Sequence, residues 1–456
     1  MADQTRDLTE GPVWRALTAM SAPMALGIFA VLSVGIADAV FLGRYSDAAL
    51  SAVGFIYPVT TAVTSLSIGL SAGANAALSQ GIGRGDEGAK TCRRALHAVG
   101  LGLLLSTLVA LGIWAASPAL FGLMGASGAV LDAVLDYMPL WSLSFPFLVV
   151  MMQLGSVFRA HGKGGLAATA MVTAAGVNVA ANPLLIFGMG PLPELGIEGA
   201  ALATLIGRAV AVGLALTIAL RAGYIALGSA PLKNLTVSMR EIFAVGAPAA
   251  FSNAINPAGM AAVTAAVATV GADAVAGFGA ATRVQSVALV PLLALSSGIG
   301  PVVGQNWGKG DETRARTAMG QSFAFCVVYA LVLGLALALF GGPIAELVTG
   351  GAAGTEKAAL YLRLVGWSLF GYGMLVTANA AMNARSKALY SMGISLTRVF
   401  ALYLPLASIG VTLGGYTGVL VAAILANVGG AVLAWWAVGQ TGLRARPLPR
   451  VTTASA

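Results

Sequence analysis

The sequence predicts an all-α polytopic membrane protein whose twelve transmembrane helices form two pseudo-symmetric six-helix bundles. Three observations lead to this prediction. Hydrophobic residues make up 58% of the 456 residues and charged residues only 9%, whereas a soluble domain carries about 25% charge. Apolar stretches of membrane-spanning length recur along the chain, and short motifs repeat at a nearly constant offset. The whole chain, with its mean hydropathy of +0.87, therefore belongs in lipid.

Twelve apolar stretches are long enough to cross a bilayer, which takes roughly 20 residues. Short loops with glycine, proline and charge separate them, such as GIGRGDEGAK at 81–90 and GKGDETRAR at 308–316. The predicted spans are residues 15–43, 50–80, 95–115, 136–158, 165–188, 197–220, 241–270, 284–305, 319–341, 360–383, 389–412 and 416–440.

The basic residues predict how the chain is oriented. Of the 25 Lys and Arg residues, nineteen fall on the side of both termini, four on the other side, and two, Arg208 and Arg398, inside spans. Because cytoplasmic loops are enriched in Lys and Arg, we expect both termini in the cytoplasm and the protein in the bacterial cytoplasmic (inner) membrane. The polar start, MADQTRDLTEGP, does not read as a signal peptide, so the first span should remain as an anchor.

An internal repeat divides the chain into two halves. QGIGRGDE at 80–87 matches QNWGKGDE at 305–312 with an offset of 225 residues, and RAHGK at 159–163 matches NARSK at an offset of 224. Repeats of this kind are typical of secondary transporters, whose substrate site lies between the repeats. Six spans in each half give both halves the same orientation in the membrane. The predicted domains are an N-terminal six-helix bundle, 1–228, and a C-terminal six-helix bundle, 229–456.

The sequence does not predict an enzyme, a metal site or nucleic-acid binding. GLSAG at 69–73 fits a nucleophile elbow, but it lies inside an apolar span, where small residues let helices pack closely. Cys92 and Cys326 predict neither a disulfide nor a thiolate metal site. The net charge of +8 is explained by loops that set topology, and no basic run with interleaved aromatics predicts nucleic-acid binding. We expect no catalytic residue and no metal cofactor.

Asp38 is the only one of the seventeen acidic residues that falls in the interior of a predicted span. The others within span limits are the first or second residue of theirs, namely Asp136, Glu198 and Glu241. A carboxylate in a membrane should be protonated, paired or hydrated, and such residues commonly mark ion pathways. It is therefore a candidate to bind a proton or a small cation. A purely structural role is the alternative, since Asp38 is only six residues before Arg44, could lie near the outer interface, and could pair with Arg208.

Asn178, Asn182 and Thr204 are candidates to complete a site around Asp38. Asn178 and Asn182 are four residues apart and share one face of the fifth span, and Pro183 follows and should bend that helix or end its regular hydrogen bonding. Amide and hydroxyl oxygens beside a carboxylate could hold a proton or a hydrated cation, so Na⁺ could bind at Asp38 and Asn178. The alternative for the two asparagines is to join helices by hydrogen bonds.

Pro23 and Pro248, which are partners at the 225-residue offset, are candidate conformational hinges. Prolines kink membrane helices where neighbours satisfy the freed carbonyls, and Pro23 precedes Asp38 in the first span. A static packing kink is the alternative. Asp38 itself has no partner in the second half, since the equivalent position is Val263.

The ordered motifs resemble those of the multidrug and toxic compound extrusion (MATE) family, in the branch with DinF-like and NorM-like members. The resemblance covers nearly the whole chain. It rests on SAPMALG, ADAVFLGRYSDAALSAVGF, GLSAGANAALSQGIGRGDE, FRAHGKGG, VNVAANPLLIFG, LGIEGAALAT and GFGAATRVQSVALVPLLALSSGIGPVVGQNWGKGD.

The resemblance implies secondary active export of cationic or amphipathic compounds against H⁺ or Na⁺ by alternating access. It matches the family's first-helix aspartate to Asp38, its fifth-helix asparagine to Asn178 and its sixth-helix threonine to Thr204. The sequence departs from that branch at Asn182, where a second aspartate is common. No acidic residue follows Glu356, so we expect no carboxylate ion site in the C-terminal half. Any coupling would therefore depend on Asp38 in the N-terminal half. A lone carboxylate favours H⁺ over Na⁺ as the coupling ion.

Two other function classes remain open at this stage. A flippase for lipid-linked oligosaccharides belongs to the same superfamily, but such proteins tend to line their cavity with several cations, and only two fall within spans here. A membrane-embedded enzyme or receptor is disfavoured because no acid, histidine or nucleophile cluster occurs. The expected partners are small amphipathic or cationic molecules and membrane lipids, and we expect a monomer with no cofactor beyond the coupling ion.

Overall fold

The computed structural model describes residues 7–189, 193–226, 228 and 230–444, and within these ranges every regular element is helical. The elements are α1 (Val13–Tyr45), α2 (Asp47–Gly83), α3 (Gly88–Leu123), α4 (Gly128–Ala160), α5 (Gly164–Ile186), α6 (Gly196–Arg221), α7 (Leu235–Ala268), α8 (Ala272–Ala288), α9 (Val290–Lys309), α10 (Glu312–Thr349), α11 (Thr355–Val365), the 3₁₀ turn η1 (Gly366–Ser368), α12 (Leu369–Ala384), α13 (Ala388–Leu396), the π-helix η2 (Thr397–Tyr403) and α14 (Leu404–Gln440).

The twelve predicted spans correspond to these helices once three interruptions are recognised. α8 and α9 meet at a 43° bend and together make the eighth span. α11, η1 and α12 make the tenth. α14 contains non-helical backbone at Gly414 and Gly415, where the eleventh span turns into the twelfth. In the described part of the chain nine helices, or ten with the bent pair counted as one span, are long and apolar enough to cross a membrane.

The repeated loop motif folds in the same way in both halves. Gly85 and Gly310, partners at the 225-residue offset, both adopt the left-handed backbone conformation, with φ of +76° and +86°. This conformation favours glycine. Asp311 then caps α10 by accepting a hydrogen bond from Arg314 N at 2.9 Å. The local chemistry of the repeat thus fixes two equivalent turns between spans.

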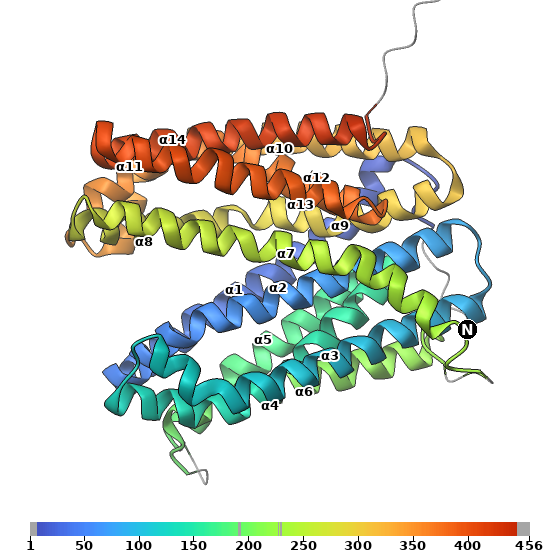
Figure 1. Ribbon diagram of the computed structural model, residues 1–456, viewed down its shortest axis with the longest axis horizontal. Helices are drawn as coiled ribbons and strands as arrows, with labels where there is room; N and C mark the ends of the chain where they lie inside the picture. The colour runs from blue at the N-terminus through green and yellow to red at the C-terminus, as the bar shows by residue number, and fades with distance from the viewer. Residues whose placement is uncertain (1–6, 190–192, 227, 229, 445–456) are drawn as a thin grey trace, which may run out of the picture.

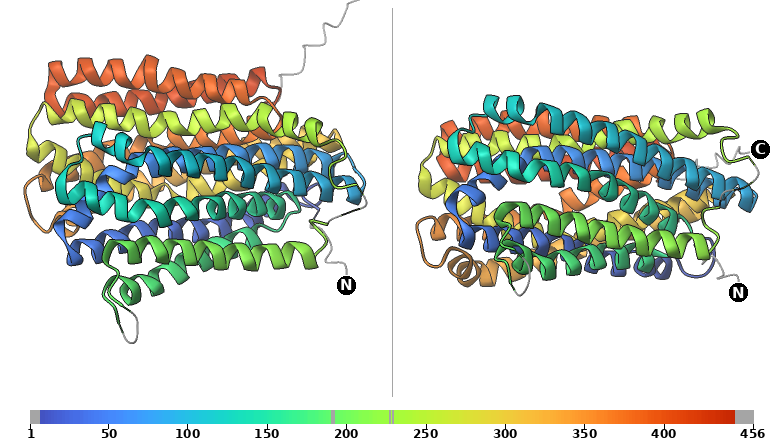
Figure 2. Two further views of the ribbon diagram at one scale, coloured as in Figure 1. Left: turned by 60° about the horizontal axis from the view of Figure 1, so that its bottom comes forward. Right: turned by 90° about the horizontal axis from the view of Figure 1, so that it is seen from below.

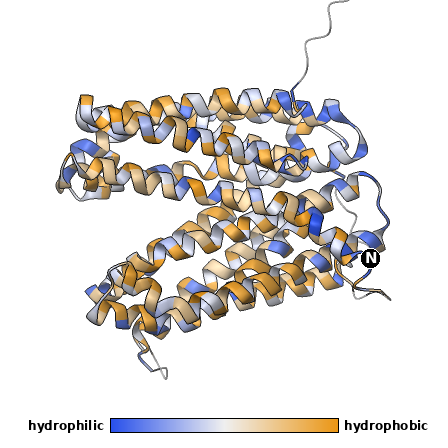
Figure 3. Cartoon of the chain, in the orientation of Figure 1, coloured by the Kyte–Doolittle hydropathy of each residue, from blue (hydrophilic) through white to orange (hydrophobic). Residues whose placement is uncertain are grey.

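The helices of the two halves lie in two groups in the view of Figure 1, and the two groups overlap in the views of Figure 2. The groups come together at the end where α1 begins and α14 ends, and their ribbons diverge toward the opposite end (Figure 1). Hydrophilic residues gather at helix ends and loops, most densely at the end where the groups meet (Figure 3). The side of the membrane that this end faces stays a prediction, and the basic residues Arg6, Arg446 and Arg450 lie outside the described residues.

The two groups meet through contacts that are equivalent under the repeat. A Cβ built on Gly73 of α2 would lie 3.1 Å from Gly246 N of α7, and one built on Gly298 of α9 would lie 3.1 Å from Ser21 N of α1. Gly73 and Gly298 are partners at the 225-residue offset, as are Ser21 and Gly246. The halves therefore meet about a pseudo-two-fold axis. The boundary predicted between 228 and 229 stays a prediction, and residue 229 is outside the described residues.

Two glutamines of the repeat cross between the halves where the groups meet. Gln80 Nε2 donates to Ala384 O at 2.6 Å and to Ser386 Oγ at 2.9 Å, while Gln305 Nε2 donates to Ala160 O at 2.7 Å. Ala160 and Ala384 occupy matching places in the second pair of repeated motifs. Each half therefore supplies one amide donor and one carbonyl acceptor. We call these two contacts the glutamine exchange.

An ionic contact between the halves lies at the same end. Arg94 of α3 pairs with Asp86 in the loop before that helix, and its other nitrogen lies 3.4 Å from Glu241 of α7. Although burial acts to raise it, hydrogen bonds from Lys90 and Arg94 hold the pKa of Asp86 below its ordinary value. Asp86 thus stays ionised and orients Arg94 toward the other half.

We predict that Gly83→Ala and Gly308→Ala loosen this end of the molecule. A Cβ at Gly83 would lie under 3.0 Å from Gln305 O, and one at Gly308 would also lie under 3.0 Å from Gln80 O, so a methyl group must push the halves apart. Distances between spin labels placed on the loops at 84–87 and 385–387 should increase in both variants. Gly88→Ala is the control, because a Cβ there meets nothing within 4 Å. Identical distances in Gly83→Ala and Gly88→Ala would contradict the prediction.

Candidate functional site

Asp38 lies on α1, seven residues before the helix ends at Tyr45, which is roughly 10 Å along the axis. This part of α1 is poorly covered by the rest of the chain, since Ile36 is 61% exposed and Val40 47%. The Asp38 side chain is half-buried. The carboxylate is therefore neither locked in a core nor free in solvent, a position in which an ion can reach it.

The fifth helix brings two asparagines to this carboxylate. Asn182 is fully buried, and its Nδ2 donates to Asp38 Oδ1 at 2.5 Å and to Asn178 Oδ1 at 3.2 Å. α5 continues through Pro183 and ends at Ile186, so the helical spacing that places both amides on one face is kept. Asn182, where the sequence departs from the pattern of the branch it resembles, is thus the residue that contacts Asp38 directly.

The sixth helix completes a chain of hydrogen bonds. Asn178 Nδ2 donates to Thr204 Oγ1 at 3.1 Å, and Thr204 Oγ1 donates to Ala200 O at the same distance. α5 and α6 approach closely here because Gly207 faces Ala174 O and Asn178 N, where a Cβ would lie 2.6 and 3.2 Å away. All four predicted residues, Asp38, Asn178, Asn182 and Thr204, are therefore brought together.

Two further polar side chains of this region were not predicted to belong to the site. The phenol of Tyr137, from α4, lies beside Thr204 and within electrostatic range of Asp38. Arg208 of α6 donates to Ser144 Oγ at 2.7 Å and also lies within electrostatic range of Asp38. From the sequence, Arg208 was named only as a candidate partner of Asp38 in a purely structural role, and the hydrogen bond that Arg208 makes here goes to Ser144. Tyr137 carried no signal, since one tyrosine in an apolar span reads as ordinary packing.

Aromatic rings hold the ends of α1 and α5 together beyond the site. Phe41 and Phe187 meet edge to face with centroids 6.4 Å apart, and Tyr45 lies equally far from Phe187. Such pairs add about 0.5–1.5 kcal/mol each beyond the area they bury. They keep the Asp38 segment of α1 next to the asparagines of α5.

One buried acceptor beside the carboxylate has no partner. Asn182 Oδ1 is buried and makes no hydrogen bond within the described chain, which costs about 1–3 kcal/mol. A proton on Asp38 would give a donor for this oxygen once the amide turned over, and a Na⁺ ion would use the same oxygen together with the carboxylate. Within the described residues no three His, Cys, Asp or Glu side chains lie together as a metal site.

The two candidate hinge prolines lie inside long helices. Pro23 in α1 leaves Ala19 O without its i+4 donor, and Pro248 in α7 does the same for Ala244 O. Val263, the partner of Asp38 under the repeat, is fully buried. The hinge role of the prolines stays a prediction, and the acidic site belongs to one half only.

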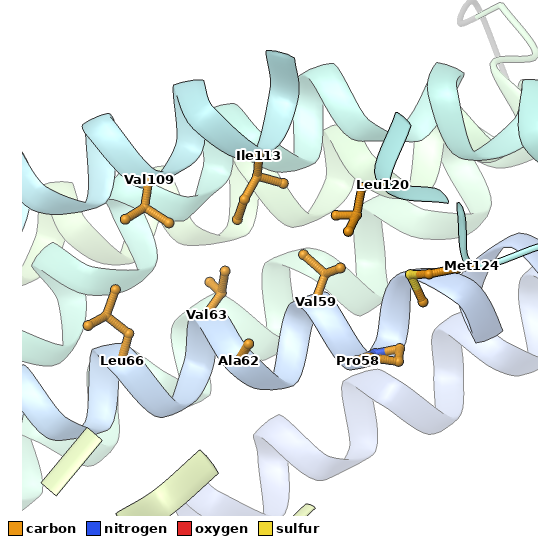
Figure 4. A pocket seen from close by; sticks show the side chains of 9 residues that line it. All are labelled: Pro58, Val59, Ala62, Val63, Leu66, Val109, Ile113, Leu120 and Met124. Carbon is orange, nitrogen blue, oxygen red and sulfur yellow. The ribbon is translucent and has the colours of Figure 1, made fainter. Parts of the chain in front are cut away.

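An apolar cavity of about 500 Å³ lies between α2 and α3 (Figure 4). Nine side chains line it and all are apolar, so nothing there could orient or discriminate a polar ligand. It is not the candidate site. Its lining residues are Pro58, Val59, Ala62, Val63, Leu66, Val109, Ile113, Leu120 and Met124.

Comparison with known proteins agrees with the repeat and with the fold. The MatE family model matches the chain twice, at residues 23–184 and 248–409. A relative from Shewanella oneidensis, named FAD transporter, is 34% identical over 424 residues, which cover 92% of this chain and 93% of the relative. The probable multidrug resistance protein NorM of Thermotoga maritima is 26% identical over 382 residues, covering 82% and 80%.

A solved structure extends the match to three dimensions. The MATE transporter VcmN of Vibrio cholerae, in its bent form, superposes with a TM-score of 0.89 and 26% sequence identity, covering 96% of this chain and 98% of that one. An all-helical membrane fold of about twelve helices is thereby confirmed.

We predict that Asp38 and Asn182 are energetically coupled. In a double-mutant cycle of Asp38→Asn and Asn182→Ala, the loss in unfolding free energy of the double mutant should differ by about 1 kcal/mol from the sum of the two single losses, as expected for contacting residues. Chemical unfolding in detergent at neutral pH measures this. Asn253→Ala combined with Asp38→Asn is the control pair, because Asn253 Nδ2 bonds Ala249 O within its own helix. Equal additivity in both cycles would count against the coupling.

Proposed function

Because the chain belongs to the MATE family of secondary transporters, and so is not an enzyme, we propose that it exports amphipathic small molecules while H⁺ or Na⁺ enters. Asp38 is the group that couples the two movements. Asn178, Asn182 and Thr204 position it and adjust to its charge. This assignment goes beyond family membership, which establishes a multi-pass transporter without identifying the ion or the cargo.

The contact between Asp38 and Asn182 is the observation that carries the proposal. With Asp38 ionised, Asn182 donates to it and its own oxygen remains unpaired. With Asp38 neutral, the acid becomes a donor and the preferred orientation of the amide reverses. One proton thus changes which hydrogen bonds hold α1 to α5. An ion that changes helix contacts is what coupling requires, since it must favour one conformation over another.

The arrangement of the halves supports alternating access as the mechanism of the proposed export. The glutamine exchange and the Arg94–Glu241 contact close the end where the groups meet, while the ribbons diverge beyond it (Figure 1). In the proposed cycle the ion binds Asp38 from the open end, α1 bends near Pro23, and the cargo leaves. The ion is released after the closed end has opened. A single carboxylate favours H⁺ as the coupling ion, because Na⁺ usually needs several oxygen ligands.

Two cargo classes are supported by different observations. The sequence predicts cationic or amphipathic drugs, and relatives named as multidrug resistance or multidrug export proteins support this class. Flavin adenine dinucleotide is the second candidate, because the relative named FAD transporter is 34% identical over 92% of the chain, whereas the two multidrug relatives are 26% and 24% identical. The net charge in the interior of the predicted spans also favours an anionic cargo, because two arginines, Arg208 and Arg398, outnumber the one acidic residue, Asp38.

We predict that Asp38→Asn abolishes ion-driven export while the protein still folds. Asparagine keeps the size of the side chain but cannot exchange a proton. In liposomes with an imposed pH gradient or an imposed Na⁺ gradient, the variant should export cargo no faster than empty liposomes. Asp47→Asn, the same change at an exposed position on the next helix, should retain wild-type rates. Export by Asp38→Asn with normal gradient dependence would falsify the coupling role.

The cargo prediction is tested with the same liposomes. Vesicles loaded with FAD and vesicles loaded with a fluorescent cationic dye should be compared under one pH gradient. Faster loss of FAD identifies the dinucleotide class, and faster loss of dye identifies the drug class. The predicted result is gradient-driven movement of at least one of the two. If neither moves above the level of empty liposomes, both cargo assignments are wrong.

A further inference from the structure

The C-terminal half contains a buried arginine that the coupling site does not use. Arg398 is only 8% exposed and lies in η2, the π-helix between α13 and α14. π-helical turns are rare and occur frequently at functional sites. An arginine inside a membrane-spanning segment is costly and usually faces the protein interior or a solvated cavity. The position of Arg398 therefore calls for a compensating partner.

The hydrogen-bond partners of Arg398 are neutral. Its Nη2 donates to Asn427 Oδ1 at 2.8 Å and its Nη1 to Asn256 Oδ1 at 3.3 Å. Asn427 is oriented in turn by donating from Nδ2 to Ser368 Oγ at 2.9 Å. The Nε–H of Arg398 is buried and unpartnered within the described chain. One donor of the guanidinium thus remains for a ligand.

Aromatic rings flank the same guanidinium. Its central carbon lies 5.4 Å from the ring centroid of Tyr372 and 6.0 Å from that of Tyr403. Cation–π contacts at these distances stabilise the charge only in part. No acid occurs beyond Glu356, and within the described residues the groups that act on Arg398 electrostatically are tyrosines, with no carboxylate among them. The positive charge is not neutralised by the protein.

The cluster is partly exposed at two residues, Asn256 of α7 and Tyr372 of α12. A ligand that touches them would reach the guanidinium from its more open side. Arginine recognises phosphate by parallel N–H···O hydrogen bonds. A tyrosine face beside it offers a surface for an aromatic ring. The cluster thus combines the two elements needed to bind a phosphorylated aromatic compound.

We propose that Arg398, with Asn256, Tyr372 and Tyr403, forms a cargo subsite that binds the phosphate group of an aromatic anion. This inference rests on the proposed export function and specifies which cargo chemistry the second half recognises. It divides the work between the halves: the N-terminal half binds the coupling ion at Asp38, and the C-terminal half binds the anionic part of the cargo.

Binding of two flavins that differ by one phosphate tests this subsite. Wild-type protein in detergent should bind flavin mononucleotide about 10- to 100-fold more tightly than riboflavin, the range given by a hydrogen bond to a charged group. Arg398→Gln should remove most of this difference by weakening the binding of the mononucleotide, and should leave the affinity for riboflavin unchanged. Arg398→Lys, which keeps the charge, should retain part of the difference.

The controls separate recognition from folding and from coupling. Arg363→Gln changes an exposed arginine of the same half and should keep the wild-type preference. Asp38→Asn should keep the preference while losing ion-driven transport, so failure of the coupling assignment and failure of the subsite are distinguishable. The subsite is overturned if Arg398→Gln weakens both flavins equally, if it weakens neither, or if wild-type protein binds neither flavin at millimolar concentration.

Discussion

The Asp38 carboxylate, which lies inside the membrane-spanning helix α1, constrains what surrounds it. A charged carboxylate is costly in a medium without water unless it has a partner. The neighbouring helices supply neutral hydrogen-bond donors. Asn182 supplies the hydrogen bond, and Asn178 and Thr204 orient Asn182. Neutral donors stabilise the charge less than a salt bridge would. The carboxylate can therefore exchange its ion, whereas a close arginine partner would hold it permanently ionised.

The scaffold is symmetric although its charges are not. The glutamine exchange and the paired contacts of Gly73 and Gly298 place equivalent residues against each other at the end where the halves meet. An interface made of two copies of one motif can open and close without new local structures. The buried charges break this symmetry: Asp38 has Val263 as its repeat partner, and Arg398, at the 224-residue offset of the second motif pair, has Ala174. Both halves thus contribute equivalent contacts to the interface, while the proposed ion site and the proposed cargo subsite lie in different halves.

The sequence was informative where local chemistry determines structure. Apolar length predicted the spans, and the repeated GRGD and GKGD motifs predicted two matching halves; the structure then showed equivalent turns at Gly85 and Gly310. The spacing of Asn178 and Asn182 placed both on one helix face. Contacts between distant helices could not be predicted: the bond from Asn182 to Asp38, the approach of Tyr137, and the crossing of Gln80 and Gln305 depend on how helices are rotated and tilted. The π-helix at Arg398 had no sequence signal, since it breaks no apolar pattern.

The thermodynamic ratio of ion to cargo tests the central role of Asp38 most directly. Liposomes with the membrane potential clamped at zero and sodium absent would be brought to equilibrium at a series of imposed pH gradients. One titrating carboxylate carries one proton, so the logarithm of the cargo ratio across the membrane should change with the pH difference with a slope close to one. If Na⁺ is the coupling ion instead of H⁺, the same slope should appear in a second series in which a sodium gradient replaces the pH gradient. A cargo ratio that stays at unity under both gradients would contradict coupling through Asp38.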